Sequence, residues 1–335
     1  NPPATWPLQE SMRVYVAKEI ARQMLSLDIG STMLEELPAP VNVYTEVQRS
    51  VLPDQVITDS GLNGPRGIAL APDGSFYVAD TGNSRIVRFD SSGNMLDSWG
   101  SRTPDGELPP SAGTFLEPWG IAVDPQGNVY VADTWNHRIQ KFDANGNFIK
   151  EWGVLGQQSD GTASLWGPRG IAVSPDGRVY VTDTGNKRVV VFDPNGKFLQ
   201  QFPAEEDVWL DEPVGIAIGN DGLVYVADTW NMQVVVFSAA GGFVTKWPVQ
   251  GWTGDSLDNK PYIAVDEQDR VYVTDPEGYR VIAFSSSGTP LAMFGQYGLE
   301  EDAFGLPVGI TADAHGRIWV VDAVNKQLRQ FDLWK

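Results

Sequence analysis

Short apolar runs of about five residues recur along this chain, each bounded by Gly, Asp, Asn or Pro. Runs rich in Val, Ile, Tyr and Phe with such boundaries are typical of β-strands. The clearest run continues into a fixed turn. It reads YVADTGNSR at 77–85, YVADTWNHR at 130–138, YVTDTGNKR at 180–188 and YVADTWNMQ at 225–233, with weaker copies YVTDPEGYR at 272–280 and WVVDAVNKQ at 319–327. The pattern therefore indicates six copies of one unit.

Each unit carries the same order of signals. A Pro-x-Gly-Ile-Ala-Val segment comes first, and a tight turn of the PDG type leads into the YVAD strand and the DTxN turn. A third strand such as RIQKF and a second turn of the NGN type follow, and a fourth strand ends in Trp or Phe. Four antiparallel strands in a unit repeated six times predict an all-β, six-bladed β-propeller.

The two ends of the repeat array predict how the ring closes. The sixth unit ends after its third strand, whereas Val56–Ile57 precede the first unit at the place of a fourth strand. We predict that this N-terminal strand completes the last blade, because closure removes an exposed sheet edge. The predicted propeller domain then spans 55–335, and 1–54 form a lead-in. Apolar residues at every fourth position between 8 and 24 predict a short helix there, with a strand at 13–16 as the alternative.

The repeated strings resemble the NHL-repeat family, in which P-x-G-I-A-V, V-Y-V-A-D-T-x-N and R-I-Q-x-F recur in six-bladed propellers. The resemblance extends over about residues 55–335 and is specific in four units. The fifth unit departs at 261–263 and 275–278, and the sixth at 323–324. The resemblance implies a recognition module of a larger membrane-associated bacterial protein. With Asn1 in place of Met, we expect the extracytoplasmic or membrane-tethered part of such a protein.

Charge and composition exclude some classes of partner and of binding site. The formal net charge of −19 opposes binding to a phosphate backbone, so we expect no nucleic-acid partner. The chain has no cysteine, which excludes disulfides and thiolate metal sites. No run of 18 apolar residues exists in the sequence, so no transmembrane segment is predicted.

The residues common to all units are interpreted as scaffold. An aspartate ends each second strand, and a short carboxylate there accepts backbone N–H bonds and ties the hairpin. Asparagines three residues later are expected at the left-handed position of the turn. The alternative is a ring of carboxylates for catalysis or calcium. The aspartates are Asp80, Asp133, Asp183, Asp228, Asp275 and Asp322.

Variable residues are then the candidates for binding. The DTxN turns and the Pro-x-Gly entries share one rim of the ring (the DTxN rim), and the PDG-type and NGN-type turns share the other (the PDG rim). At the channel mouth on the DTxN rim, the variable residues suit an anionic or glycan ligand, because Arg binds carboxylates and aromatic rings stack on sugars. The alternative is that they merely cover loops. The candidates are Arg66, Trp119, Arg169, Tyr262, Trp135, His137, Lys187, Trp230 and Tyr279.

Catalysis is the competing hypothesis. Some NHL propellers resemble amidating lyases that use a His-bound zinc, but this chain has only His137 and His315, predicted on opposite rims. A catalytic zinc usually has three protein ligands. A calcium-assisted hydrolase or lyase using the same mouth stays the alternative, with no cofactor assigned. A third hypothesis is a protein-interaction platform through Trp135, Trp230 and Trp252.

Overall fold

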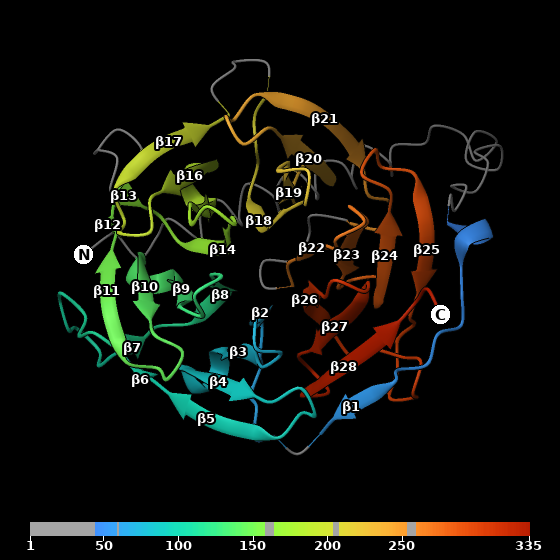
Figure 1. The fold of residues 1–335 in the computed structure, drawn as a ribbon, viewed down its shortest axis with the longest axis horizontal. Helices are drawn as coiled ribbons and strands as arrows, with labels where there is room; N and C mark the ends of the chain where they lie inside the picture. The colour runs from blue at the N-terminus through green and yellow to red at the C-terminus, as the bar shows by residue number, and fades with distance from the viewer. Residues whose placement is uncertain (1–43, 59, 158–163, 204–207, 253–258) are drawn as a thin grey trace, which may run out of the picture. The chain divides into compact units, whose positions relative to one another are not determined.

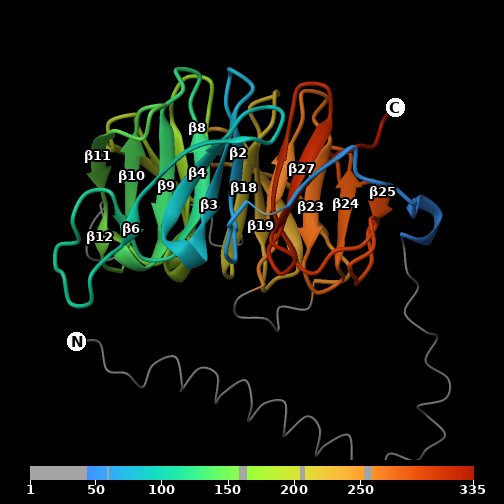
Figure 2. The ribbon, with the colours of Figure 1, turned by 90° about the horizontal axis from the view of Figure 1, so that it is seen from below.

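The computed structural model describes residues 44–58, 60–157, 164–203, 208–252 and 259–335. Within them, six four-stranded antiparallel sheets surround a central axis as the blades of a propeller (Figure 1). Seen from the side, the strands run between two rims (Figure 2). The predicted fold class is therefore confirmed. The helix predicted between residues 8 and 24, and its strand alternative, lie outside the described residues.

The first three blades follow each other along the chain, and the strands of each run in sequence order from the channel outward. Blade 1 consists of β2 (Ile68–Leu70), β3 (Phe76–Asp80), β4 (Arg85–Phe89) and β5 (Met95–Trp99). Blade 2 consists of β8 (Pro118–Val123), β9 (Val129–Asp133), β10 (Arg138–Phe142) and β11 (Phe148–Trp152). Blade 3 consists of β14 (Pro168–Val173), β15 (Val179–Asp183), β16 (Arg188–Phe192) and β17 (Phe198–Phe202).

Blades 4 and 5 are built in the same way, whereas the outer strand of blade 6 comes from the N-terminal side of the chain. Blade 4 consists of β18 (Pro213–Ile218), β19 (Val224–Asp228), β20 (Gln233–Phe237) and β21 (Phe243–Pro248). Blade 5 consists of β22 (Ile263–Val265), β23 (Val271–Asp275), β24 (Arg280–Phe284) and β25 (Pro290–Phe294). Blade 6 consists of β26 (Pro307–Ala312), β27 (Arg317–Asp322), β28 (Gln327–Asp332) and the N-terminal β1 (Gln55–Ile57).

Short elements decorate the DTxN rim. The turns of blades 1 to 3 are single 3-10 turns, η2 (Thr81–Asn83), η3 (Thr134–Asn136) and η5 (Thr184–Asn186). Two loops each contain a small parallel pair, β6 (Ser101–Arg102) with β7 (Thr114–Phe115), and β12 (Val154–Leu155) with β13 (Ser164–Leu165). A further 3-10 turn, η1 (Thr45–Val47), precedes β1.

Residues 44–49 pack on the outside of blade 5. The buried Tyr44 ring meets Phe284 edge-on at 6.1 Å, and its hydroxyl accepts the Gln250 N–H at 2.9 Å. The backbone N–H of Arg49 donates to the Met293 carbonyl of β25 at 2.8 Å. This part of the predicted lead-in is therefore held by the propeller.

The second strands read as continuous apolar runs because both of their faces are buried. Tyr130 and Ala132 of β9 belong to the core between blades 2 and 3. Val129 and Val131 of the same strand belong to the core between blades 1 and 2. Successive side chains of a strand point to opposite faces, so each second strand contributes apolar side chains to the cores on both sides of its blade.

An aromatic residue near the end of the fourth strand fills each of the five seams that follow blades 1 to 5. It packs against the phenylalanine of the third strand in the next blade, and in the first four of these seams a glycine of the NGN-type turn leaves room for it. The ring centroids are 5.9 Å apart for Trp99–Phe142, 6.0 Å for Trp152–Phe192, 4.9 Å for Phe202–Phe237, 6.0 Å for Trp247–Phe284 and 4.8 Å for Phe294–Phe331.

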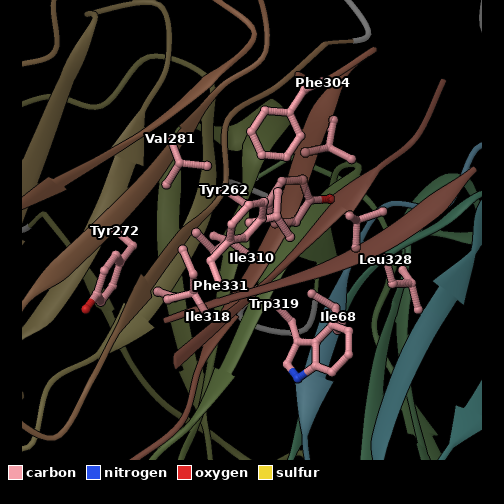
Figure 3. Packing of buried hydrophobic residues seen from close by; sticks show 14 of the residues in the cluster. Ile68, Tyr262, Tyr272, Val281, Phe304, Ile310, Ile318, Trp319, Leu328 and Phe331 are labelled. Atoms are coloured by element: carbon pink, nitrogen blue, oxygen red, sulfur yellow. The ribbon is translucent and has the colours of Figure 1, made fainter. Parts of the chain in front are cut away.

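The sixth seam is closed by the N-terminal strand, as predicted. Val56 pairs with Arg329 and Ile57 with Leu328 in an antiparallel ladder. Ile57 takes the place of the aromatic residue and faces Gly93 of blade 1. It belongs to the cluster that spans blades 5, 6 and 1, part of which is shown in Figure 3. The closing seam therefore contains an aliphatic side chain where the other five contain a ring.

Shortening Ile57 is expected to weaken the whole ring. Ile57→Ala removes a side chain that is only 8% exposed, and should lower the free energy of unfolding by about 2–4 kcal/mol. The matched control is Val56→Ala on the same strand, where the side chain is 40% exposed and the loss should stay below about 0.5 kcal/mol. Urea unfolding measures both. Equal losses in the two variants would contradict the closure argument.

Candidate functional site

The recurring aspartate of each blade is buried and ties the entering loop to the hairpin. In blade 2, Asp133 Oδ1 accepts the backbone N–H of Leu116 at 2.8 Å. Its Oδ2 accepts Asn136 Nδ2 at 2.8 Å and Arg138 Nε at 2.9 Å. The equivalent loop N–H groups of Asn63, Trp166, Asp211 and Leu306 donate to Asp80, Asp183, Asp228 and Asp322 at 2.6–2.9 Å. The predicted scaffold role is confirmed for these aspartates.

Blade 5 and the asparagines differ in detail from the expectation. Asp275 accepts the N–H of Gly278 in its own turn at 3.1 Å, since the fifth unit lacks the usual turn sequence. The prediction that the asparagines are left-handed is wrong. Asn136 is the last residue of η3, and the next residue, His137, has φ 55°. The asparagine is needed for its side chain, which donates to the aspartate.

Four predicted ligand residues meet at the DTxN end of the channel, although they come from four blades. The guanidinium carbon of Arg66 lies 3.7 Å from the centroid of the Trp119 ring, and that of Arg169 lies 4.4 Å from it. Both cations also act electrostatically on the Tyr262 hydroxyl. Trp119 is 1% and Tyr262 7% exposed, so these side chains fill the mouth. We name this group, together with Glu212 and Lys260, the mouth cluster.

Glu212 and Lys260 complete the mouth cluster and were not found from the sequence. Glu212 Oε1 accepts Arg169 Nη1 at 2.6 Å, and its Oε2 accepts Lys260 Nζ at 2.8 Å. Lys260 Nζ lies 5.7 Å from the ring centroid of Trp230, another predicted residue. Both residues stand directly before the proline that opens their unit, so comparing that variable position between units could have found them.

Two polar groups of the mouth cluster are buried without a hydrogen-bond partner among the described residues. They are the Tyr262 hydroxyl and the Trp119 indole nitrogen. Burial raises the pKa of Tyr262 to about 12, although the charges of Arg66 and Arg169 lower it. The phenol is therefore protonated at neutral pH and is available as a donor. Buried polar groups are normally hydrogen-bonded, so each such group calls for an explanation.

Below the mouth cluster the channel is hollow. A cavity of about 190 Å³ is lined by the inner strands from the glycines of Pro-x-Gly to the strand ends, and by Tyr262. Its side chains are mostly Ile, Ala and Val, with Thr311 as a hydroxyl. Exposure increases along the inner strands toward the PDG rim. The mouth cluster therefore separates the channel from the DTxN rim.

Glycines of the inner strands fix the backbone positions of Trp119 and Arg169 in the mouth cluster. The N–H of Gly67 donates to the carbonyl of Trp119 in the next blade at 3.0 Å. A Cβ on Gly120 would collide with the carbonyl oxygen of Arg169. Only a residue without a side chain allows this approach, so the backbones that carry Trp119 and Arg169 are set by the ring itself.

The other predicted residues lie on the DTxN rim with partners of their own. Trp135 Nε1 donates to Glu117 Oε2 at 3.0 Å, and His137 Nδ1 accepts the Gly167 N–H at 3.0 Å. Lys187 pairs with Asp211 at 2.7 Å, and the Tyr279 ring meets Tyr297 at 4.7 Å. The structure therefore brings together Arg66, Trp119, Arg169 and Tyr262, with Trp230 alongside.

Trp252 cannot serve as an exposed contact of an interaction platform. It is 5% exposed, and its Nε1 donates to the Thr274 carbonyl at 3.1 Å. Trp135 is 41% exposed and Trp209 is 60% exposed, so other rim tryptophans are accessible. The expectation for Trp252 is wrong because its indole is buried and donates to a carbonyl of blade 5.

Metal ligands do not gather in the part of the chain that the structure describes. Among those residues no group of three His, Asp or Glu side chains is placed to hold an ion. Calcium stays a prediction. A helix long and apolar enough to cross a membrane is likewise not found among the described residues.

Comparison with known proteins identifies the repeat. The model of the NHL repeat matches residues 62–89, 115–142, 165–192 and 210–237. Peptidyl-glycine alpha-amidating monooxygenase A of Xenopus laevis is 41% identical over 91 residues, which is 26% of this chain and 10% of that protein. Protein brain tumor of Drosophila melanogaster is 47% identical over 53 residues, 16% of this chain and 5% of that protein. The chain thus spans a tenth or less of these relatives.

A solved structure supports the fold over most of the chain. The gluconolactonase of Xanthomonas campestris superposes with a TM-score of 0.60 at 19% identity, and the match covers 84% of this chain and 89% of that one. An identity this low shows a shared fold alone, because one fold carries many activities.

The partly buried His137 is expected to make stability depend on pH. Burial lowers the pKa of His137 from 6.5 to about 4. The unfolded chain binds a proton between these pH values and the folded chain does not, so the free energy of unfolding falls as the pH decreases from 6.5 to 4. His137→Asn keeps an acceptor for the Gly167 N–H and should remove roughly 2–3 kcal/mol of this dependence.

Urea unfolding at pH 7 and pH 4.5 measures the effect as the difference between wild type and variant. His315→Asn, on the exposed turn of the PDG rim, is the control. A pH dependence that is the same in all three proteins would show that His137 is not held neutral by burial.

Proposed function

Because the chain is an NHL-repeat six-bladed β-propeller, we propose that it is a non-catalytic binding propeller whose mouth cluster receives an anionic group. The observation that carries this proposal is the convergence of Arg66, Arg169 and Tyr262 on Trp119 at one end of the channel. The guanidinium groups of Arg66 and Arg169 can only donate hydrogen bonds, and the protonated Tyr262 phenol has a hydroxyl hydrogen to donate. A carboxylate or phosphate accepts such bonds and balances the positive charge.

Glu212 supports this choice of ligand chemistry. Its carboxylate already bridges Arg169 and Lys260, so the cluster holds one anionic group of the chain itself. Glu212 has φ 53° directly before a proline, as Glu117 has at the equivalent position of blade 2, so this backbone conformation belongs to the repeat. What distinguishes Glu212 is the contact of its carboxylate with the two cations.

Access to the cluster is provided by Arg66. It is partly exposed, whereas Trp119, Arg169, Tyr262 and Lys260 are buried. A ligand carboxylate at Arg66 would approach the Tyr262 hydroxyl and the Trp119 indole N–H, which would give both groups a partner. A sugar ring that carries the carboxylate would meet the aromatic groups at the rim. The predicted extracytoplasmic or membrane-tethered location stays a prediction.

Tyr262→Phe separates binding from folding. It removes one buried, unpartnered hydroxyl without changing the volume of the ring, so the free energy of unfolding of the empty protein should rise by about 1 kcal/mol. Affinity for an anion should fall about tenfold or more, because a hydrogen bond to a charged group is lost. Calorimetric titration with glucuronate, and with glucose as the uncharged match, measures this at constant salt.

Arg66→Ala and Arg169→Ala should each weaken glucuronate binding more strongly than Tyr262→Phe does. Tyr297→Phe, whose ring is 73% exposed, is the control and should leave affinity and stability unchanged. The proposal fails if glucuronate and glucose bind alike, or if the arginine variants bind as the wild type does.

A further inference from the structure

A second surface on the DTxN rim, over blades 5 and 6, carries exposed apolar side chains. Tyr297 is 73%, Leu299 84% and Val324 62% exposed. The Tyr279 ring stands against Tyr297, with centroids 4.7 Å apart and planes at 61°. We name these four residues the tyrosine patch. Exposed apolar side chains that cluster in this way are more typical of interaction sites than of ordinary surface.

The loop that carries the tyrosine patch is held in place by blade 6. Asn325 Nδ2 donates to the Gly298 carbonyl at 3.3 Å, and Arg329 Nη1 donates to the Glu301 carbonyl at 3.2 Å. Tyr297 forms a parallel bridge with the buried Phe304. Holding the loop in advance lowers the entropy lost on binding.

Three glutamates adjoin the tyrosine patch along the chain, Glu277 two residues before Tyr279 and Glu300 with Glu301 directly after Leu299. Glu277, Glu300 and Glu301 are exposed, and the Glu300 and Glu301 carboxylates form no ion pair among the described residues. Arg329 does not neutralise them, because its guanidinium is buried and binds backbone carbonyls of the loop. Lys326 is the nearby exposed cation, and it leaves the surroundings acidic. A cation is attracted both to the face of an aromatic ring and to a carboxylate, so this surface suits a cationic ligand.

We propose that the tyrosine patch and its carboxylates bind an arginine-bearing segment of a partner protein. A guanidinium stacks on aromatic faces and pairs with carboxylates in a planar geometry, which an ammonium does less well. Leu299 and Val324 contact apolar neighbours of the arginine in such a segment. This site is independent of the mouth cluster, because its charge is opposite and it shares no residue with it.

The probe is a fluorescently labelled tetra-arginine peptide, measured by anisotropy against the whole chain at 0.15 M salt. Tetra-lysine is the matched peptide of equal charge. We expect the arginine peptide to bind at least threefold more tightly than the lysine peptide. Tyr297→Ala should abolish this preference, and Glu300→Gln with Glu301→Gln should weaken binding of both peptides about tenfold.

An acidic chain attracts basic peptides everywhere, so the control removes two charges elsewhere. Glu46→Gln with Glu267→Gln neutralises two exposed glutamates outside the tyrosine patch, and should change affinity less than twofold. Equal weakening by the two double variants, or an arginine preference that survives Tyr297→Ala, would overturn the proposal. Glucuronate binding should be unchanged in every one of these variants, so failure here is distinguishable from failure of the mouth cluster.

Discussion

The propeller depends on a carboxylate that is buried at the end of each second strand. Asp133 joins a loop N–H, an asparagine amide and an arginine guanidinium at one point, and blades 1 and 3 repeat this arrangement. Burial raises the pKa of Asp133, Asp183, Asp228 and Asp275, since desolvation disfavours the charged form. Each carboxylate uses its oxygens to hold the chain, and none remains for a ligand in the channel.

That constraint determines where function can reside. Residues shared by the units hold strands and loops together, so a partner is met by residues in which the units differ. The mouth cluster and the tyrosine patch both follow this rule. The first combines variable residues of the Pro-x-Gly entries and their preceding positions, and the second combines variable residues of two turns with a non-repeating loop. Their charges are opposite although they occupy one rim.

Much of the architecture could be predicted from the sequence, because periodicity and turn residues are local signals. The place of Ile57 in blade 6 followed from counting strands, and the scaffold role of the aspartates followed from their presence in every unit. The site was harder to predict. That Trp119 is covered by two guanidiniums, and that Glu212 reaches Lys260, depends on distances between blades. No pattern within one unit carries that information, and the burial of the Trp252 indole was missed for the same reason.

The three-residue strand β1 also has a mechanical consequence. It is the sole closing strand of the ring in the described chain, and it lies between residues 44–54 and blade 1. Tension applied on the N-terminal side of Tyr44 would first load the contacts of Tyr44 and Arg49 with blade 5 and then the ladder with β28, before any other seam, since the remaining blades are each continuous in sequence. The ring would then open at the seam that contains Ile57, while the five seams that contain aromatic rings stayed packed.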